Sequence, residues 1–538
     1  MTTADVVGPA LSALALYLLV TALAERTSPR GRWALIGLTL VFTGRYMLWR
    51  VAELVAAEPA PTLFALAVFA LEAALFAEGM LTLLIAARRA DRSAEADRAE
   101  RWVAGVDAVD LPTVDVFIPT YDEGPEVLER TIAAATALDY PSFTVFVLDD
   151  GRRDWVGALA RRHGAVHRTR PDNAHAKAGN INAALAHTAG DLILVLDADF
   201  CALPGLLRRT VGLFRQDPRI AIVQLPQAFF NPDPIQHNLG LTRVWPDDQR
   251  LFFEEIMPVR DAWDLAFCCG TNALYRRDRL EAIGGVPTAS VTEDILTTLV
   301  QRRRGWITRY LGEPLALGLC PESVTALLVQ RRRWCRGNVQ LLFCRDGPLG
   351  PGPLSLWTRL QFLPLYWLVA LPGRALLAGL PALCLWTGLA PYPGATGATL
   401  AAFLLPALGL TLATTMRLLP GAYVPLLSDS YQLYMGAKLI PTVLSTLIKP
   451  FGAPFRVTPK GHAAVGNGDR PAAVAVVVAI ALSLGAVLLQ LDPAAATFDE
   501  RALANVAVFW VVFNVVALLV VLLHVTETPR RRGEERFL

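Results

Sequence analysis

Apolar residues are concentrated in long runs toward the two ends of the chain, whereas the middle of the chain mixes apolar and polar residues. A helix needs about 20 apolar residues to cross about 30 Å of hydrocarbon. Seven runs approach that length, three before the middle region and four after it: 6–24, 33–57, 61–87, 361–390, 398–416, 472–491 and 506–523. The pattern predicts about three transmembrane helices in residues 1–90, a soluble domain in 91–355 and about four transmembrane helices in 356–528.

The distribution of Lys and Arg predicts how these helices are oriented. Basic residues gather in the loops at 26–32, 88–98 and 438–470, and in the tail 529–538 with its Arg530-Arg531-Arg532 run. All of these segments fall on one side if the N-terminus lies outside, and basic loops favour the cytoplasmic side. We therefore expect a cytoplasmic soluble domain and a cytoplasmic tail.

Two further segments lie on the predicted cytoplasmic side. Residues 429–447 mix Tyr431, Tyr434 and Leu439 with polar residues, which is typical of an amphipathic interfacial helix, with a short re-entrant or core helix as the alternative. Residues 449–461 are basic and rich in proline, and predict a loop.

The middle region alternates short apolar runs with helical stretches. Residues 114–119, 143–148 and 192–196 predict buried strands, and 125–137 and 178–187 predict helices. Strands that alternate with helices indicate a parallel α/β sheet. Ligands bind such sheets at the carboxyl ends of the strands, so the residues that follow each strand are candidates for a site.

Acidic residues follow two of the predicted strands. Asp149 and Asp150 precede Gly151, and Asp197 is separated by one residue from Asp199. Two carboxylates on a tight turn can hold Mg²⁺ together with substrate phosphates, and the cation would then offset the charge of a diphosphate leaving group. Taken alone, pairs of this kind at a strand end are more often turn-forming acids.

Two later clusters also carry chemistry. Thr292-Glu293-Asp294 offers a general base for an attacking hydroxyl, or else an N-cap Thr in front of a helix at 295–303. Gln330 to Trp334 offers an Arg that can clamp a phosphate and a Trp that can stack on a sugar. The alternative is that Arg331, Arg332 and Arg336 anchor the domain to anionic headgroups.

Composition narrows the class of protein. Apolar residues make up 54% of the chain and charged residues 18%, below the roughly 25% of soluble domains, which excludes a disordered or coiled-coil chain. Lys and Arg (50) nearly balance Asp and Glu (48), so no nucleic-acid partner is expected. The seven cysteines form no C-x-x-C pair and suggest neither a disulfide framework nor a zinc site.

Taken in order, these pieces resemble the processive family-2 glycosyltransferases, most closely the catalytic subunit of bacterial cellulose synthase and cellulose synthase-like β-glucan synthases. The resemblance runs from about Arg45 to Val525. The matching pieces are Asp149-Asp150-Gly151, Lys177-Ala178-Gly179-Asn180-Ile181-Asn182, Asp197-x-Asp199, Phe229-Phe230-Asn231-Pro232-Asp233-Pro234, Thr292-Glu293-Asp294, Gln330-x-x-Arg333-Trp334 and the loop Phe455-x-Val457-Thr458-x-Lys460-Gly461.

The resemblance implies a polytopic α-helical membrane protein with an inserted cytoplasmic α/β (GT-A-like) glycosyltransferase domain. It also implies the role of each matching residue. Asp294 would be the general base. Asp199 and Asp197 would bind the metal ion, which would be Mg²⁺ or, alternatively, Mn²⁺. The nucleotide-sugar would be held by Thr120, Tyr121, Glu123, Asp149, Lys177, Asp197, Gln330 and Arg333. The acceptor would be held by Cys269, Gly270, Thr271, Glu293 and Trp334. The gating loop would be formed by Phe455, Val457, Thr458 and Lys460.

The activity implied by the resemblance is inverting transfer of glucose from UDP-glucose to a nascent polysaccharide. The polymer would be cellulose, (1,3)-β-glucan or a mixed-linkage glucan, and would be translocated across the bacterial inner (plasma) membrane. Membrane lipid, and periplasmic or outer-membrane export partners, are the further contacts expected. The alternatives are a non-processive transferase that makes a glycolipid or polyprenyl-linked sugar, and a transporter or scaffold with a degenerate transferase domain.

The sequence departs from the family pattern in two places. Phe267-Cys268-Cys269-Gly270-Thr271 has Cys where the family has a second Phe, which weakens any statement about acceptor shape. The chain ends at Leu538 without the PilZ domain that bacterial cellulose synthases typically carry, so we expect no direct regulation by cyclic-di-GMP through such a domain. In the apolar runs, Glu72 and Glu78 either line a channel or pair with Arg45 and Arg50.

Overall fold

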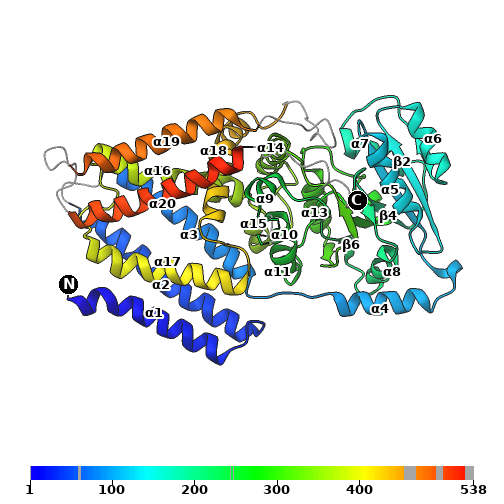
Figure 1. Ribbon diagram of the computed structural model, residues 1–538. Helices are drawn as coiled ribbons and strands as arrows, with labels where there is room; N and C mark the ends of the chain where they lie inside the picture. The colour runs from blue at the N-terminus through cyan, green and yellow to red at the C-terminus, as the bar shows by residue number, and fades with distance from the viewer. Residues whose placement is uncertain are drawn as a thin grey trace. The chain divides into compact units, whose positions relative to one another are not determined.

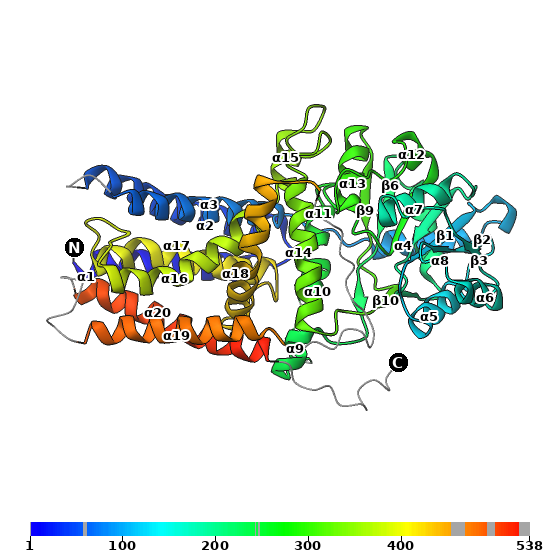
Figure 2. The ribbon, with the colours of Figure 1, turned by 90° about the horizontal axis from the view of Figure 1, so that it is seen from above.

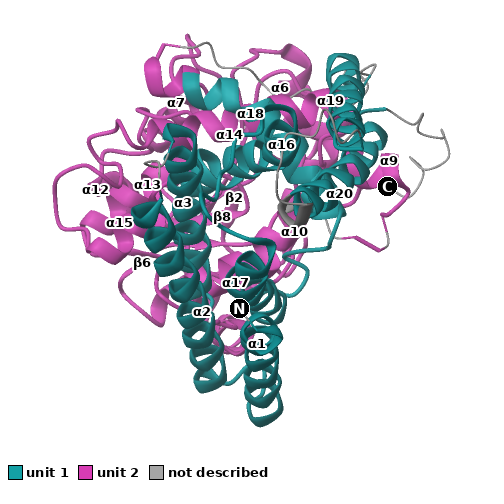
Figure 3. Cartoon of the chain, turned by 90° about the vertical axis from the view of Figure 1, so that its left-hand side faces the viewer, with its two compact units in different colours: residues 1–88, 364–444, 467–527 teal, residues 89–363, 445–466, 528–538 magenta. Residues whose placement is uncertain are grey.

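The computed structural model describes residues 2–57, 62–242, 244–245, 248–452, 468–491 and 501–526. The chain divides into two compact units, coloured teal and magenta in Figure 3. Unit 1 is built from residues 1–88, 364–444 and 467–527, and unit 2 from residues 89–363, 445–466 and 528–538. Each unit therefore collects segments that lie far apart in the sequence.

Unit 1 is helical. Its helices are α1 (Thr3–Leu23), α2 (Pro29–Ala56), α3 (Leu63–Ile85), α16 (Leu371–Thr387), α17 (Gly397–Leu418), α19 (Arg470–Leu489), α20 (Arg501–Val525) and most of α18 (Leu427–Ile448). Helix α17 packs against α1 and α2, and α16 packs against α19 and α20 (Figure 1). Among the described residues, six helical segments are long and apolar enough to cross a membrane: 3–23, 63–85, 366–387, 397–418, 470–489 and 504–525.

Two of the predicted spans differ from expectation, the second and the fourth. The second forms the helix α2, which is not among the six segments, because Arg45 and Arg50 lower its mean hydropathy. The predicted span 361–390 is also shorter than expected. Helix α15 (Leu356–Phe362) ends before Leu363, the residue in front of Pro364, and residues that precede proline disfavour the helical conformation. The interfacial position expected for 429–447, now within α18, stays a prediction.

A buried ion pair lies inside unit 1. Arg50 is fully buried, and its Nε lies 3.1 Å from Glu72 Oε2. Glu72 also accepts hydrogen bonds from Tyr46 (3.1 Å) and Tyr392 (2.6 Å). Of the two interpretations of Glu72, pairing with Arg50 is therefore the one confirmed. Arg45 instead donates to the Ala402 carbonyl at 2.8 Å.

Unit 2 is an α/β domain around one central sheet. Its strands are β1 (Val114–Thr120), β2 (Phe143–Asp149), β3 (Val166–Arg168), β4 (Leu192–Val195), β5 (Cys201–Ala202), β6 (Ile220–Gln224), β7 (Ala228–Phe229), β8 (Ala273–Arg276), β9 (Ile307–Tyr310) and β10 (Ala316–Gly318). Seven strands form a sheet in the order β3-β2-β1-β4-β8-β6-β9, and β5-β10-β7 form a second, small sheet.

Helices cover both faces of the central sheet (Figure 2). One face packs against α4 (Ser93–Ala104), α5 (Pro125–Thr136), α6 (Asp154–Arg162) and α8 (Leu206–Thr210). The other face packs against α7 (Ala176–Leu185) and α12 (Arg277–Ala282). The remaining helices of the unit are α9 (Pro234–Leu239), α10 (Asp248–Leu251), α11 (Met257–Asp261), α13 (Glu293–Arg303), α14 (Val324–Gln340) and α15.

The sequence predicts the first half of this sheet correctly. β1, β2 and β4 pair in parallel, and the predicted helices are found as α5 and α7. The sheet as a whole is mixed rather than parallel, because β8 runs antiparallel to both β4 and β6. The direction of β8 was not expected, because the direction of a strand depends on the path of the chain before it rather than on its own residues.

Candidate active site

The acidic turns meet at one edge of the central sheet. Strands β2, β1 and β4 are neighbours and parallel, so their carboxyl ends lie together. Thr120, the last residue of β1, pairs in register with Asp149, the last residue of β2. Asp197 and Asp199 follow β4. The fold thus brings together the strand ends that the sequence marks as candidates.

A cleft of about 660 Å³ opens at the ends of β1 and β2. Its walls include Tyr121, Glu123, Asp150, Arg153 and Trp155. The Tyr121 side chain is 49% exposed, and Arg153 lies 5.0 Å from the ring centre of Trp155. Aromatic rings beside cations and carboxylates suit a nucleotide, since bases stack on aromatic side chains.

Arg153 connects the predicted nucleotide-binding residues to one another. Its guanidinium lies 3.0 Å from Asp149 Oδ1, and it donates to Thr120 Oγ1 at 2.7 Å and to the Glu123 carbonyl at 2.8 Å. Glu123 in turn accepts from Thr120 Oγ1 at 2.7 Å. Asp149 and Thr120 are both buried, so this hub fixes side chains that solvent does not reach.

A second arginine shapes the approach to α7. Arg170 grips Asp150 with two bonds of 2.6 and 2.7 Å and also donates to the carbonyls of Ala174 and Ala176. A Cβ on Gly179 would lie 2.0 Å from the Ala174 oxygen, so only glycine fits there. Part of the motif from Lys177 to Asn182 therefore serves the packing of α7. The first residue of the motif, Lys177, is the one that reaches the site.

The next cluster is formed by Lys177, Asp197 and the loop 265–272, which directly precedes β8. Lys177 Nζ donates to Asp197 Oδ1 and, at 2.7 Å, to the Gly270 carbonyl. The Asp197 amide donates to Thr271 Oγ1 at 2.8 Å. Burial opposes the charge of Lys177, but Asp197 and Glu293 outweigh it and raise the pKa of Lys177.

Asp294 adjoins the same loop. Gly270 has a φ of +84°, and a Cβ there would lie 3.2 Å from Asp294 Oδ2. Burial, and then the neighbouring Glu293, raise the pKa of Asp294 to about 7. A carboxyl with this pKa is suited to taking up a proton near neutral pH.

The alternative role for Thr292 is not supported. Thr292 occupies the N-cap position of α13, but its side chain makes no capping hydrogen bond. Its hydroxyl lies 3.2 Å from Ser290 Oγ instead. The turn in front of Asp294 is therefore held by contacts other than a cap.

The two cysteines in this loop have different surroundings. Cys268, which stands where the family has a second Phe, is fully buried, and its sulfur lies 2.8 Å from Tyr275 Oη. Burial raises the pKa of the Cys268 thiol to about 12. Cys269 is half-buried, and its backbone amide donates to Gln224 Oε1 at 2.7 Å. The departure from the family pattern thus falls on a core position.

The remaining predicted cluster lies on α14. Gln330 is buried and accepts from Arg331 at 3.0 Å, and the Arg331 guanidinium lies 4.4 Å over the Trp334 ring. Arg331 is 3% exposed, so it is a packing residue of α14 rather than an exposed headgroup anchor. Arg333 and Trp334 are half-buried on the same helix.

Asp197 and Asp199 are the residues that fit a divalent cation. Asp199 is 3% exposed, and its Oδ2 accepts from the Leu319 amide at 3.2 Å, which fixes its orientation. A cationic group, Lys177 Nζ, already lies against Asp197. Within the described ranges no group of three or more metal-binding side chains gathers, so substrate phosphates would have to complete the coordination.

Several motif residues have structural rather than chemical roles. Asn180 Nδ2 donates to the Leu148 carbonyl at 2.8 Å, and Asn182 holds the backbone of Val286. Asn231 makes a pair of hydrogen bonds with the backbone of Cys320. The predicted gating loop, with Phe455, Val457, Thr458 and Lys460, lies outside the described residues.

Sequence reasoning missed Arg153, Arg170 and Gln340, all of which make several contacts near the site. Arg153 follows Asp149 by four residues, a spacing that marked a possible ion pair. Arg170 left no such signal, because its acidic partner Asp150 lies 20 residues away. Gln340 left none, because its partners Val291 and Pro450 come from distant segments.

Residues 115–284 match the family described as glycosyl transferase family 2. The chain is 38% identical over 356 residues to the cellulose synthase 1 catalytic subunit (UDP-forming) of Komagataeibacter xylinus, covering 65% of this chain and 47% of that protein. It is 34% identical over 461 residues to the cellulose synthase catalytic subunit (UDP-forming) of Pseudomonas fluorescens, covering 85% of this chain and 61% of that one.

Two further likenesses cover most of the chain. It is 32% identical over 548 residues to putative cellulose synthase 2 of Komagataeibacter xylinus, covering 98% of this chain and 35% of that protein. Among solved structures, the mannosyltransferase PcManGT from Pyrobaculum calidifontis in complex with GDP-Man and Mn²⁺ is 22% identical, with a TM-score of 0.47, covering 72% of this chain and 99% of that one.

The chain spans less than two thirds of the length of each of these cellulose synthases. The family match covers β1 to α12, the part of unit 2 that contains the cleft and the acidic turns. Residues 115–284 of this chain are thus similar to the family-2 glycosyltransferases, and the chain is similar to the catalytic subunits of bacterial cellulose synthases.

Proposed function

We propose that this chain is a processive, inverting β-glucan synthase. It would polymerise glucose from UDP-glucose and translocate the polymer across the bacterial inner membrane. The observation that carries the proposal is the Asp294 carboxyl, which has a pKa of about 7 and adjoins the loop that Lys177 binds. This cluster combines a carboxyl group, Asp294, that can accept a proton near neutral pH with an ammonium group, Lys177, that can bind a diphosphate.

The proposed steps follow from the positions of these side chains. Thr120, Tyr121, Glu123 and Asp149 hold the nucleoside in the cleft that Arg153 organises. Asp294 takes the proton of the acceptor hydroxyl, whose oxygen then attacks the anomeric carbon as the bond to UDP breaks. Lys177 and Arg333 balance the charge of the departing diphosphate.

Asp197 and Asp199 would hold Mg²⁺ or Mn²⁺. When bound, such a cation offsets negative charge on the diphosphate. In the described structure Lys177 Nζ lies against Asp197, so Lys177 neutralises this carboxylate in the absence of a cation. The Leu319 amide, which donates to Asp199 Oδ2 at 3.2 Å, orients the Asp199 carboxylate.

The relatives support the choice of a polymer over a single transfer. Two of them are named UDP-forming cellulose synthase catalytic subunits, and the match continues beyond the transferase domain to as much as 98% of this chain. Trp334, half-buried on α14, would hold the growing end of the polymer, and Cys269, Gly270, Thr271 and Glu293 would line its approach.

The test uses the purified chain in proteoliposomes with Mg²⁺ and radiolabelled UDP-glucose, with UDP-N-acetylglucosamine and UDP-galactose as comparisons. We expect a high-mass product from UDP-glucose alone. Digestion with (1,4)-, (1,3)- and mixed-linkage-specific glucanases would identify the linkage. A product that extracts into organic solvent would instead favour a lipid glycosyltransferase, and label from another donor would overturn the choice of glucose.

A further inference from the structure

The Gln340 side chain joins two segments that are far apart in sequence. It is 4% exposed and lies at the C-terminal end of α14. Its Oε1 accepts from the Val291 amide at 3.0 Å, and its Nε2 donates to the Pro450 carbonyl at 2.7 Å. Both ends of a buried amide are thus satisfied by backbone groups, an arrangement that fixes the position of each partner.

The turn that Gln340 holds is the one that leads into Asp294. Ser290 Oγ lies 3.4 Å from Gln340 Oε1 and donates to the Gly337 carbonyl at 3.1 Å. The Thr292 amide donates to Ser290 Oγ at 3.1 Å. Two residues of α14, one turn apart, therefore hold successive residues of the turn 290–292.

The packing at Gly337 leaves this turn little freedom. A Cβ on Gly337 would lie 2.3 Å from Thr292 Cγ2 and 2.6 Å from its Oγ1, so the backbone of α14 lies directly against Thr292. Thr292 itself makes no capping hydrogen bond. The start of α13 is consequently set by α14 rather than by its own N-cap residue.

We infer that Gln340 is a positioning residue for Asp294, which it orients through the turn 290–292. The inference rests on the proposed function, in which Asp294 is the base. It gives α14 two tasks: its middle carries Arg333 and Trp334, and its C-terminal end holds the turn before the base. A displacement of about 1 Å at a catalytic group can lower the rate of reaction about 100-fold.

The charged and titratable groups around Asp294 come from several elements. Glu293 lies on its own helix, Lys177 on α7, Cys268 in the loop 265–272, and Tyr275 on β8. None of these is bonded to Gln340 in the contacts described above. Loss of Gln340 should thus act on the position and burial of Asp294, not on its charged neighbours.

The experiment compares Gln340→Met, Gln340→Glu and Gln301→Met in the full chain. Met is close to Gln in size and removes both hydrogen bonds, whereas Glu keeps the acceptor for Val291 and loses the donor to Pro450. Gln301 is a matched control: it is a buried Gln on α13, 1% exposed, whose side chain has no hydrogen-bond partner among the described residues.

We expect Gln340→Met to lower kcat about 10- to 100-fold while the Kd of UDP stays within about twofold. The acid limb of its kcat–pH profile should move toward lower pH, since a displaced Asp294 gains contact with water. Gln340→Glu should retain more activity than Gln340→Met, and Gln301→Met should match the unmodified chain in both kcat and pH profile.

Other outcomes distinguish a failure of the positioning role of Gln340 from a failure of the proposed function. If Asp294→Asn abolishes transfer but Gln340→Met has normal kcat and pH profile, the positioning role is wrong and the proposed function stands. The same conclusion follows if Gln340→Met loses UDP binding in proportion to kcat, because the effect is then general unfolding. If Asp294→Asn transfers glucose normally, the proposed function fails with it.

Discussion

At the scale of single residues, Arg153 organises the cleft at the ends of β1 and β2. Its guanidinium contacts Asp149, Thr120 and the Glu123 backbone, and the Asp149 and Thr120 side chains are buried at this edge of the sheet. A hydrogen bond to a charged group contributes about 1.5–3 kcal/mol. The arrangement of the cleft therefore depends on this one side chain as much as on the residues that would touch UDP.

We expect Arg153→Met to weaken UDP binding about 10- to 100-fold, measured by calorimetry on the purified chain. Arg153→Lys should recover only part of the loss, because one ammonium group cannot reach three partners in the plane of a guanidinium. Arg162→Met, on the exposed side of the same helix α6, serves as the control and should bind UDP normally. Equal Kd values for Arg153→Met and the unmodified chain would contradict the role.

Asp294 gives a second prediction at this scale. With its pKa at about 7, the carboxyl is mostly protonated below that pH and cannot act as a base. We expect kcat to fall about tenfold per pH unit below 7, while UDP binding changes little. Glu293→Gln removes a cause of the raised pKa, so the acid limb of the profile should shift to lower pH. A profile that is flat between pH 5 and pH 8 would exclude Asp294 as the base.

The same pKa has a consequence for stability. Folding raises the pKa of Asp294 from 3.8 to about 7, so the folded chain binds more protons than the unfolded chain between these values. Stability gained from this proton is present at the acid end of the window and is lost as the pH rises through 7. The raised pKa of Asp294 is therefore maintained at some cost to the stability of the fold, and the surrounding contacts must offset that cost.

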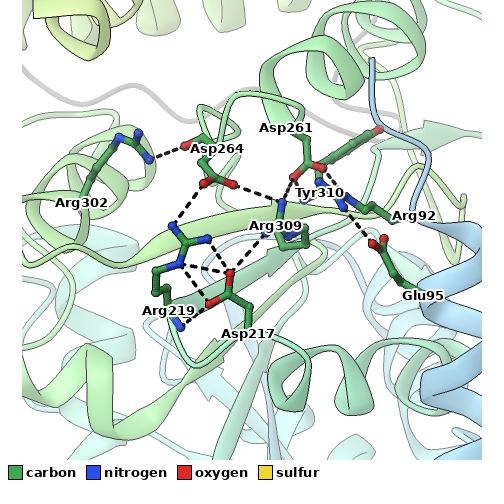
Figure 4. A network of polar contacts seen from close by, with 9 residues as sticks. All are labelled: Arg92, Glu95, Asp217, Arg219, Asp261, Asp264, Arg302, Arg309 and Tyr310. Carbon is green, nitrogen blue, oxygen red and sulfur yellow. Dashed lines mark hydrogen bonds and ion pairs between the residues drawn. The ribbon is translucent and has the colours of Figure 1, made fainter. Parts of the chain in front are cut away.

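At the scale of elements, an ionic network fixes the segment that leads into the loop 265–272. Figure 4 shows Asp261, at the end of α11, between Arg92 and Arg309. Asp261 Oδ2 accepts from Arg92 at 2.6 Å, and its Oδ1 accepts from the Tyr310 amide at 2.9 Å. Asp264, Asp217, Arg219 and Arg302 extend the network. Helix α11, strand β9 and helix α13 are thereby tied together.

Asp261→Asn should destabilise unit 2 by about 3 kcal/mol, because it removes the buried carboxylate that pairs with both Arg92 and Arg309, and Arg309 then keeps only the less buried Asp264 and Asp217. For a unit of this size the melting temperature should fall by about 6–12 °C, as followed by intrinsic fluorescence in detergent. The matched change Asp278→Asn removes surface ion pairs of 3.5–3.6 Å and should leave the melting temperature nearly unchanged. Similar effects of the two substitutions would show that the network does not stabilise the unit.

Elements also show what sequence can and cannot predict. β1, β2 and β4 were predictable because each is a short, mainly apolar run followed by polar residues, and the acidic turns were expected at those ends. The antiparallel direction of β8 was not predictable, since the direction of a strand depends on the path of the chain between strands. The Thr292 cap was an equally reasonable local pattern, but the long-range contact with Gly337 overrides it.

At the scale of the whole molecule, each unit has its own set of buried contacts. The membrane-spanning pattern was predictable from apolar runs, whereas the pairing of Arg50 with Glu72 was one of two interpretations that sequence alone left open. Long-range partners of this kind depend on how helices pack, which periodicity does not encode. The division into units implies that a lesion in one need not unfold the other.

Glu72→Gln tests that implication. The substitution leaves the fully buried Arg50 without its counter-charge and should destabilise unit 1 by about 3 kcal/mol. Adding Arg50→Met should restore part of this stability, because the unpaired charge is then removed.

Of the seven cysteines Cys384 alone lies in unit 1, and it is 3% exposed, so its labelling by a thiol reagent during heating, located by mass spectrometry, reports the opening of that unit. We expect Cys384 in Glu72→Gln to react at a lower temperature, while the Kd of UDP and the labelling of the buried Cys268 in unit 2 stay unchanged. Simultaneous loss of UDP binding and protection at both cysteines would mean that the two units unfold as one, and the transferase domain would then depend on the helical unit for its stability.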